Sequence, residues 1–366
     1  MKKMIQGLAL ACCCVLWSCV VLADKPYNEL EIRQATLTQY PEIIRIPEDG
    51  VEVTIGDLHG NALKLLYFLI SNDVITVSRE NYRRFVAIYG KNPEKLTEKD
   101  LVLFHDMLDA ASVNTRHKIR FLGDDLCDRG MNDYYTLSIY KKLDTAGVAF
   151  DIVLSNHGHF FLTALERDEP SFDYNPYGEG RHESTVRSML NMGKLIARGL
   201  VDKRDILDTI QTQYLKHLVL PGYVLNEKKQ EITIYSHAPL DLAMLAALAE
   251  DLNLPFRDSD LKSLAESFDG INRQIHQWIM AHTLTAHYRE LKEKHEEQGR
   301  SSPLADVLWN RNYTILEREH HPKGKAYSVS YVHGHDSTSN VFDLDNVFGK
   351  GDRHHYGPYA VHLTHS

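Results

Sequence analysis

The sequence predicts a layered α/β fold, because three strand-like segments are each followed by a polar loop and then by a segment with helical apolar spacing. All three predicted strands end in polar residues. The composition is that of a globular protein, since 43% of the 366 residues are hydrophobic and 25% are charged, which suffices for one large domain or two small ones. Ligands of such folds bind beyond the carboxyl ends of the strands, so function is expected there.

Residues 1–23 have the features of a secretory signal, since Lys2 and Lys3 precede an apolar run that ends in VLA. An uncleaved anchor helix is the alternative, because about 20 apolar residues can span a bilayer. Four of the five cysteines lie in this segment, so residues 24–366 contain only Cys127 and no intrachain disulfide is expected. We therefore expect export to the periplasm or beyond, with no stable membrane contact after signal removal.

The charge balance argues against general nucleic-acid binding. The chain has 41 basic and 50 acidic residues, for a formal net charge of −9. Proteins that bind the phosphate backbone broadly carry an excess of Lys and Arg instead. The 20 histidines point toward metal binding at some of them.

The strands and helices are expected in alternation. The first predicted strand is VEVTI at 51–55, which alternates and is rich in β-branched residues, and the loop GDLHG and a helix over 61–71 follow it. The second strand is KIRFL at 118–122, and the third is AFDIVLSN at 149–156. The helices after these two strands are expected over 131–147 and 160–166.

Two segments are expected to be helical insertions in a single domain that spans 24–366. Residues 75–116 are charged and rich in Tyr and Phe, and residues 240–300 are charged with helical spacing. Both are expected to shape access to the substrate. Further strands are expected at 231–239, 327–336, 340–351 and 359–363, and a polar loop with helical segments at 167–230.

The predicted strands end in side chains of one chemical kind. Asp, His and Asn side chains are ligands that a borderline divalent cation such as Mn²⁺, Fe²⁺ or Zn²⁺ accepts. A carboxylate shared between two ions makes a two-metal site about 3.5–4 Å wide, which polarises a phosphoryl oxygen and generates a bridging hydroxide for in-line attack on phosphorus. The strand-end residues are Asp57, His59, Asp124, Asn156, His157, His237 and His335.

Five motifs, GDLHG, GDDLCDRG, SNHGH, SHAP and HGHD, run in this order from Gly56 to Asp336. They resemble the signature of the phosphoprotein phosphatase (PPP) family of calcineurin-like metallophosphoesterases, bacterial type, whose pattern is GDxHG, GDxxDRG, GNHE, a strand-end His and a later Gly-His. FDLDNVFGKG, residues 342–351, resembles the closing strand and turn of that family. The resemblance covers the core and not the insertions. It implies a layered β-sandwich core flanked by helices.

The resemblance also implies a role for each matching residue. Asp124 would bridge two divalent metal ions, Mn²⁺ first, with Fe, Zn or Mg as alternatives. His157 would be the general acid, oriented by Asp128. Arg129 and Arg311, the latter in LWNRN, would clamp the phosphate. The remaining ligands would be Asp57 and His59 for the first ion, and Asn156, His237 and His335 for the second.

The chain departs from the family pattern at SNHGH, where Ser155 replaces Gly and Gly158 replaces Glu. That Glu is a supporting group and not a metal ligand, and His159 is expected to take over part of its hydrogen bonding. His333 is expected to be a neighbour of the site, and Asp125 a supporting or solvated group. The histidines expected at the surface are His354, His355, His362 and His365.

The resemblance implies a hydrolase, namely a metal-dependent phosphatase that acts on phosphomonoesters of Ser or Thr in proteins, with Tyr left open. A small-molecule phosphohydrolase, such as a dinucleoside polyphosphate hydrolase, is the alternative on the same core. A catalytically dead binding module is a third interpretation, against which the retained metal motifs argue. Bacterial relatives of the family include effectors delivered into host cells, so a host phosphoprotein is a further expected substrate. The sequence leaves the oligomeric state open.

Overall fold

The computed structural model describes residues 28–46, 49–170, 172–311, 319–320, 322–336, 343–351 and 355–365. The predicted signal at 1–23, residues 340–342 of the predicted closing strand and His354 lie outside them. Among the helices of the described residues, none is long and apolar enough to cross a membrane.

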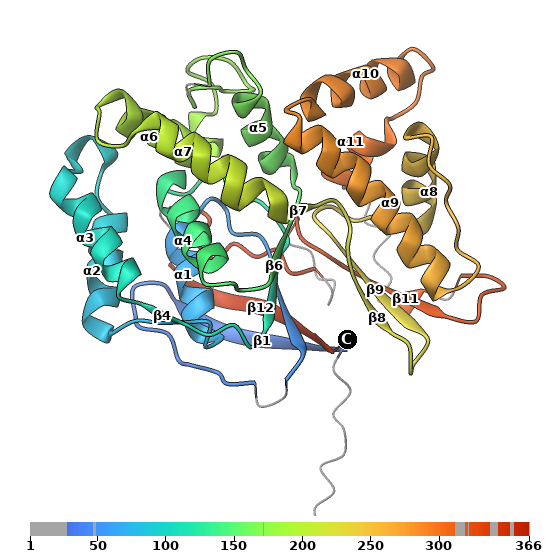
Figure 1. The fold of residues 1–366 in the computed structure, drawn as a ribbon, viewed down its shortest axis with the longest axis horizontal. Helices are drawn as coiled ribbons and strands as arrows, with labels where there is room; N and C mark the ends of the chain where they lie inside the picture. Colours follow the sequence, from blue (N-terminus) through green and yellow to red (C-terminus); the bar gives the residue numbers. More distant parts are fainter. Residues whose placement is uncertain are drawn as a thin grey trace, which may run out of the picture.

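Two sheets pack against each other, and helices cover their outer sides (Figure 1). In the larger sheet β2, β5, β6 and β7 are parallel, and β12 runs antiparallel to its two neighbours. This confirms the predicted layered α/β fold. The larger sheet consists, in spatial order, of β1 (Asn28–Thr36), β12 (Tyr356–His365), β2 (Val51–Ile55), β5 (Lys118–Phe121), β6 (Phe150–Val153) and β7 (Leu218–Val219).

The smaller sheet is four-stranded, with β9 and β11 parallel at its centre. Its order is β10 (Glu319–His320), β11 (Ser328–His333), β9 (Glu231–Ser236) and β8 (Gly222–Asn226). A separate two-stranded pair consists of β3 (Ile75–Thr76) and β4 (Ser112–Val113).

A small buried cluster joins the two sheets. Val153 of β6 and Ala360 of β12 meet Val332 of β11 in this cluster. The hydroxyl of Tyr235 lies 3.1 Å from Nδ1 of His362, so His362 is buried between the sheets and not at the surface as predicted. The polar pair is satisfied there, which is what allows a histidine in this position.

The helices divide into two groups (Figure 1). Rings of α4 and α1 pack on the larger sheet, since Tyr140 stacks on Phe150 at 5.6 Å and Phe68 lies 4.8 Å from Tyr359. The first group comprises α1 (Ala62–Ser71), α2 (Arg79–Tyr89), α3 (Glu98–Asp109), α4 (Asp133–Thr145), α5 (Asn156–Leu165), α6 (Arg187–Ala197) and α7 (Lys203–Thr209). The second group, beside the smaller sheet, comprises α8 (Leu242–Asp251), α9 (Leu261–Met280), α10 (Leu284–Glu296) and α11 (Pro303–Trp309).

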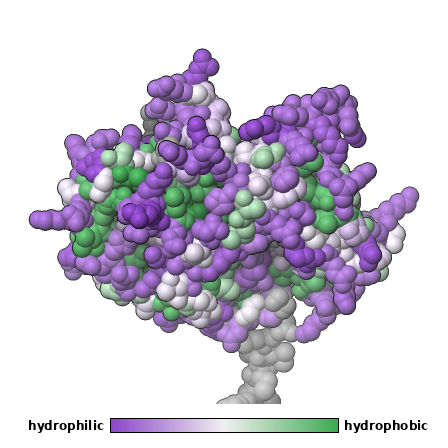
Figure 2. All heavy atoms as spheres, turned by 45° about the horizontal axis from the view of Figure 1, so that its top comes forward, coloured by the Kyte–Doolittle hydropathy of each residue, from purple (hydrophilic) through white to green (hydrophobic). Residues whose placement is uncertain are grey.

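Polar caps start the helices that follow the strand-end loops. Asn61 accepts the backbone N–H of Lys64 at the start of α1, and Ser155 caps α5 in the same way. Because of this cap, α5 begins at Asn156 and not at residue 160 as predicted, so His157 lies in its first turn. The surface in Figure 2 is mostly hydrophilic, with apolar residues in separate patches.

The predicted closing strand at 340–351 is wrong for its described part. Residues 343–351 contain only an isolated bridge, between Asp343 and His333. The segment is instead a loop that passes close to the strand ends. A Cβ added to Gly56 would lie 2.0 Å from the carbonyl oxygen of Leu344, so the closing loop needs a glycine opposite it.

Candidate active site

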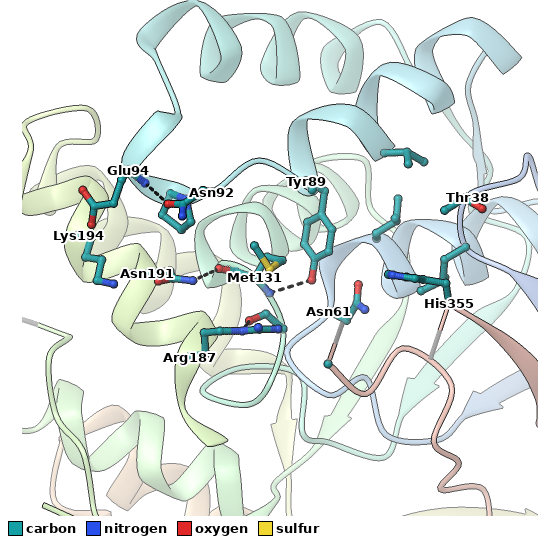
Figure 3. A pocket seen from close by; sticks show the side chains of 17 residues that line it. Thr38, Asn61, Tyr89, Asn92, Glu94, Met131, Arg187, Asn191, Lys194 and His355 are labelled. Carbon is teal, nitrogen blue, oxygen red and sulfur yellow. Dashed lines mark hydrogen bonds between the residues drawn. The ribbon is translucent and has the colours of Figure 1, made fainter. Parts of the chain in front are cut away.

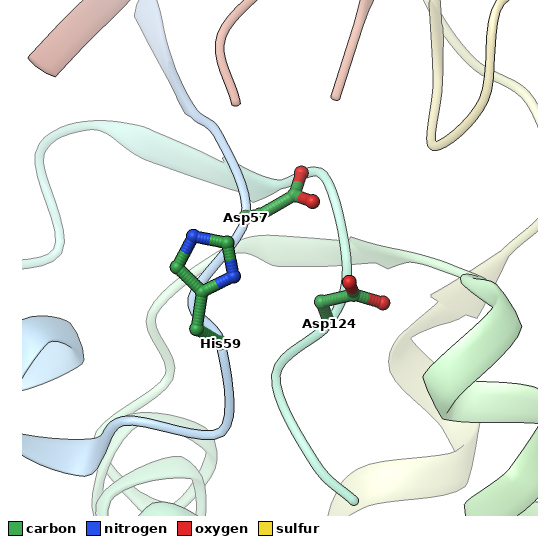
Figure 4. A group of neighbouring side chains, drawn as sticks. All are labelled: Asp57, His59 and Asp124. Atoms are coloured by element: carbon green, nitrogen blue, oxygen red, sulfur yellow. The ribbon is translucent and has the colours of Figure 1, made fainter. Parts of the chain in front are cut away.

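Two predicted metal ligands and the predicted bridging carboxylate come together beyond the carboxyl ends of β2 and β5 (Figure 4). Asp57 and His59 lie in the loop after β2, and Asp124 lies in the loop after β5. One ligand atom from each of these buried residues lies within 4.8 Å of the others. Asp124 belongs to a second such group, with Asp128 and His157. Asp124 is therefore the side chain that the two groups share.

The other predicted ligands meet at His237, which follows β9. Its Nε2 lies 2.7 Å from Oδ1 of Asn156 and 3.4 Å from Oδ1 of Asp124. Nδ1 of His335, which follows β11, lies 3.0 Å from the same Nε2. The backbone N–H of His335 donates to the carboxylate of Asp57, at 3.2 Å and 3.1 Å from its two oxygens. The structure thus brings all six predicted ligands into one connected cluster.

Three of these residues occupy the left-handed backbone region, with φ of +57° at His59, +48° at Asp124 and +76° at His335. This conformation is unfavourable for residues with a Cβ and clusters at functional sites. Gly334 lets its neighbour approach Asp57, since a Cβ at residue 334 would lie 1.9 Å from Oδ1 of Asp57. The Gly-His order at this strand end therefore has a steric reason.

Ser155 ties the Asp124 loop to the start of α5. Its hydroxyl oxygen accepts the backbone N–H of Asp124 at 2.9 Å and that of Gly158 at 2.8 Å. A hydroxyl can accept both because it has two lone pairs. The serine that departs from the family pattern thus supplies a contact that a glycine could not, and this contact positions Asp124 beside Asn156.

The proton on His237 can be placed from its contacts. Nδ1 lies 2.8 Å from the carbonyl oxygen of Leu122, and because a carbonyl only accepts, Nδ1 carries the proton. Burial lowers the pKa of His237, which favours the neutral ring. Its Nε2 then presents a lone pair toward Oδ1 of Asn156 and Oδ1 of Asp124. Electron-pair donors from three residues face one another at this point.

The predicted general acid, His157, is oriented mainly by the backbone. Its Nδ1 donates to the carbonyl of Cys127 at 2.6 Å, and Cys127 itself is buried. Nε2 of His157 lies 3.6 Å from Oδ1 of Asp128, which is too far for a hydrogen bond. That oxygen accepts from Arg129 at 2.6 Å instead. The orienting role of Asp128 stays a prediction.

The carboxylates of the cluster have strongly perturbed pKa values. Burial, and then the charges of Asp345 and Asp124, raise the pKa of Asp57 well above its usual range. Burial also opposes ionisation of Asp128, but His157 and His59, whose Nδ1 lies 3.5 Å from Oδ2 of Asp128, hold the pKa of Asp128 well below its usual range. The pKa values of two carboxylates in one site are thus shifted in opposite directions.

Sequence reasoning missed Asp345, Asn346 and Lys64. Nε2 of His59 lies 3.3 Å from Oδ1 of Asp345 and donates to the carbonyl of Asn346 at 2.6 Å. Lys64 donates to the backbone carbonyl of Asp57 at 2.6 Å, and burial lowers the pKa of Lys64 to about 8. Signals for two of them exist, because Asp345 belongs to the closing motif and Lys64 is the lone charge in an apolar helix.

The loop that carries Arg129 is held by side chains of α2 and α6 (Figure 3). The hydroxyl of Tyr89 accepts the N–H of Met131 at 3.0 Å, and Asn191 donates to the carbonyl of Met131 at 2.7 Å. Arg187, also missed in the sequence, donates to the carbonyls of Arg129 and the next residue. These side chains line a pocket of about 640 Å³. Its described lining contains none of the predicted ligands.

The second predicted clamp, Arg311, lies at the rim of the site. Its side chain is 54% exposed and forms an ion pair with Asp336. Burial, followed by His237 and more weakly by Arg311, lowers the pKa of His335 to about 3. Arg311 is therefore close enough to act electrostatically on the cluster, and its clamp role stays a prediction.

Three residues beside the site, His159, Asp125 and His333, were expected to support or adjoin it. Neither ring nitrogen of His159 has a hydrogen-bond partner among the described residues, so it does not replace the hydrogen bonding of the missing Glu. Asp125 is buried and not solvated, and burial raises its pKa to about 7. Nδ1 of His333 donates to the carbonyl of Gly334 at 2.9 Å, which places His333 beside the cluster.

The donor set fits divalent metal ions. In the described part of the chain, Oδ1 of Asp124, Nδ1 of His59 and Nε2 of His335 are buried without a hydrogen-bond partner. Such atoms are rare in folded proteins because they cost free energy. Carboxylate, imidazole and amide oxygen are together the ligands of Mn²⁺, Fe²⁺ or Zn²⁺.

Comparisons with known proteins identify the family of the chain. The chain is similar to a crystal structure of the phosphatase domain from the Legionella effector WipB, with a TM-score of 0.65 and 26% sequence identity over 81% of this chain and 99% of that one. No curated protein matches the chain. The family described as WipA-like, phosphatase domain, matches residues 118–350. The chain therefore belongs to the WipA-like phosphatase domain family, and it is a phosphatase.

Proposed function

We propose that this phosphatase is a metal-dependent phosphoesterase of the calcineurin-like PPP type, which hydrolyses phosphomonoesters on proteins. Two divalent ions, Mn²⁺ first, would supply Lewis-acid activation of the phosphate and of the attacking water. The residues that would hold them are Asp57, His59, Asp124, Asn156, His237 and His335.

One observation carries the proposal, namely that Asp124 is shared between two buried groups of ligand-type side chains. One group contains the proposed ligands Asp57 and His59, and the other contains Asp128 and His157, the proposed general acid and its partner. Of the ligands proposed for the second ion, His237 places its Nε2 3.4 Å from Oδ1 of Asp124 and 2.7 Å from Oδ1 of Asn156. A shared carboxylate with ligands on both sides is the arrangement that a two-metal phosphoesterase requires.

The remaining side chains would act on the substrate directly. The guanidinium of Arg129 would form paired hydrogen bonds to phosphate oxygens. His157, with its Nδ1 proton engaged by the Cys127 carbonyl, would carry its second proton on Nε2 and donate that proton to the leaving oxygen. Asp128, 3.6 Å from Nε2, would stabilise the charged ring.

The test is a substrate and metal panel with the purified chain. After treatment with a chelator, activity on p-nitrophenyl phosphate should be lost and should return with Mn²⁺ or a related ion. Peptides with phosphoserine, phosphothreonine or phosphotyrosine should then be compared with dinucleoside polyphosphates. Full activity of chelator-treated, metal-free protein would refute the metal proposal. A strong preference for the nucleotides would refute the protein substrate.

We also propose that the chain is exported, with residues 1–23 as its signal. The similar WipB domain comes from a Legionella effector, which supports a host phosphoprotein as the substrate. Residues 24–366 would form a single domain, with insertions near 75–116 and 240–300 that shape the approach to the site.

A further inference from the structure

A groove of about 530 Å³ lies between α5, α10, α11 and the segment at 174–176. Its described lining includes the rings of Phe160, Tyr174, Tyr288 and Trp309, together with Ala305 of α11. None of the predicted metal ligands lines this groove in the described part of the chain. The groove is therefore separate from the cluster of predicted ligands.

His159 points to a ligand in this groove. It lines the groove, is only 6% exposed, and neither ring nitrogen has a hydrogen-bond partner among the described residues. Its ring packs against Tyr288 at a centroid distance of 4.2 Å. A neutral imidazole has one donor and one acceptor, and burial lowers the pKa of His159 to about 4. The wall of the groove thus holds a buried donor and acceptor that no described residue engages.

The groove adjoins the candidate active site through a wall one ring thick. Phe160 contacts His157 edge to face at 5.7 Å, and Trp309 contacts His335 at 6.4 Å. Phe160 and Trp309 contact each other at 5.2 Å. An extended chain advances about 3.3–3.6 Å per residue. A polypeptide whose phosphorylated side chain is in the site would therefore reach the groove within two or three residues.

We propose that this groove binds the polypeptide that flanks the phosphorylated residue, and that it takes one apolar side chain among its four rings. The proposal rests on the proposed protein phosphatase function. A bound backbone offers N–H and carbonyl groups, and either can pair with a ring nitrogen of His159. A polyphosphate would need several cations, whereas the lining residues that the structure describes include a single lysine, Lys292, and a carboxylate, Asp306. The lining chemistry therefore favours a peptide over a nucleotide.

The experiment compares three substrates. Two are phosphopeptides that differ only at the flanking positions, with apolar residues in one and glycine in the other, and the third is p-nitrophenyl phosphate. Parent protein should prefer the apolar peptide in kcat/KM by roughly tenfold, the effect of burying one apolar side chain. The small ester cannot reach the groove, so it reports on the catalytic centre alone.

Two variants and a matched control separate the groove from the centre. Ala305→Arg fills the groove and should abolish the preference while leaving p-nitrophenyl phosphate hydrolysis unchanged. His159→Phe keeps the ring but removes its hydrogen bonds, and should lower kcat/KM for both peptides roughly threefold to tenfold. Ala286→Arg, at an exposed alanine of α10 outside the groove, should change nothing.

Four other outcomes would contradict the proposal, each for a different reason. Equal hydrolysis of the two peptides by parent protein would show that the groove does not read flanking residues. An equal loss on p-nitrophenyl phosphate in Ala305→Arg would place the effect in the catalytic centre. With a dinucleoside polyphosphate as an additional substrate, a loss in Ala305→Arg that is confined to this nucleotide would assign the groove to a base. Hydrolysis of the small ester without either peptide would refute the proposed function itself. If Ala305→Arg fails to fold, the proposal is still tested by two measurements. These are the preference of the parent protein for the apolar peptide and the kcat/KM of His159→Phe.

Discussion

Nδ1 of His335 lies 3.0 Å from Nε2 of His237, although the two residues are 98 positions apart in the chain. They meet because β9 and β11 are adjacent and parallel, with His333 opposite Ser236. The N–H of Gly334 extends the ladder by donating to the carbonyl of His237 at 2.8 Å. Parallel pairing thus brings two predicted ligands to the same edge of the smaller sheet.

Loss of the shared carboxylate should remove both predicted metal ions. Asp124→Asn should lower the metal content of the purified chain and reduce turnover by roughly 10²-fold or more, because the carboxylate serves both ions. Mass spectrometry of bound metal and p-nitrophenyl phosphate kinetics measure the two effects. Asp125→Asn is the matched control, since this buried neighbour is outside the cluster. A single ion per fully active chain would contradict the two-metal prediction.

Each predicted clamp should affect binding of the phosphate. Arg129→Ala and Arg311→Ala should each lower kcat/KM, by roughly 10- to 100-fold for loss of a charge-assisted pair of hydrogen bonds. Arg129→Lys should recover only part of the lost kcat/KM, because the ammonium group of lysine is a point charge and cannot form the paired hydrogen bonds. Arg204→Ala, at an exposed arginine of α7, is the control. If Arg311→Ala is as active as the parent, Arg311 does not bind the phosphate and only forms the ion pair with Asp336.

The sequence predicted the parts of the fold that local patterns specify. VEVTI is both β-branched and alternating, and β2 follows it residue for residue. The strand β1 was missed because NELEIRQAT is polar and its partner β12 begins at residue 356. The start of α5 was misplaced because a polar cap, Ser155, was read as the end of a strand.

The same distinction applies to the candidate site. The motif residues could be predicted because Asp57, His59 and Asp124 are in short turns with recognisable spacing. Asp345 acts from a loop that is distant in sequence, so only the folded chain brings it to His59. Arg187 acts on backbone carbonyls, and a role of that kind leaves no motif in the sequence.

The stability of the protein should depend on pH through Asp133. Burial raises the pKa of Asp133 from 3.8 to about 8 in the folded state, and the backbone N–H of Cys127 donates to its carboxyl at 2.8 Å. Between these values the folded chain holds a proton that the unfolded chain releases. Stability is therefore greatest below about pH 4 with respect to this group, and it falls by up to about 1.4 kcal/mol per pH unit as the pH rises toward the folded pKa.

Asp133→Asn should remove this dependence, because the amide keeps an acceptor and cannot ionise. Denaturant unfolding of parent and variant from acid to about pH 8 should show the parent losing stability relative to the variant. Asp106→Asn changes an exposed residue of α3. Its free energy of unfolding should vary with pH as that of the parent does. A constant difference between parent and Asp133→Asn would mean that Asp133 is ionised in the folded chain.

The N-terminus of protein recovered from a secreting cell should be Asp24. A signal peptidase reads the small or modest residues at 21–23 and cleaves after them. N-terminal sequencing and thiol titration should give this start and one free thiol, since Cys127 is the only cysteine in 24–366. Membrane-bound material that retains Met1 would support the anchor instead.

The general acid should be separable from the ligands by the choice of leaving group. His157 is predicted to protonate the departing oxygen. Its contribution to the rate depends on how much that oxygen needs a proton. A serine alkoxide is a poor leaving group, whereas a nitrophenolate leaves readily. His157→Asn should therefore lose roughly 10²–10⁴-fold on a phosphoserine peptide and much less on p-nitrophenyl phosphate, with its metal content retained. His237→Asn, a change of ligand, should lose activity on both substrates together. Equal losses for His157→Asn on the two substrates would show that the proton comes from another group.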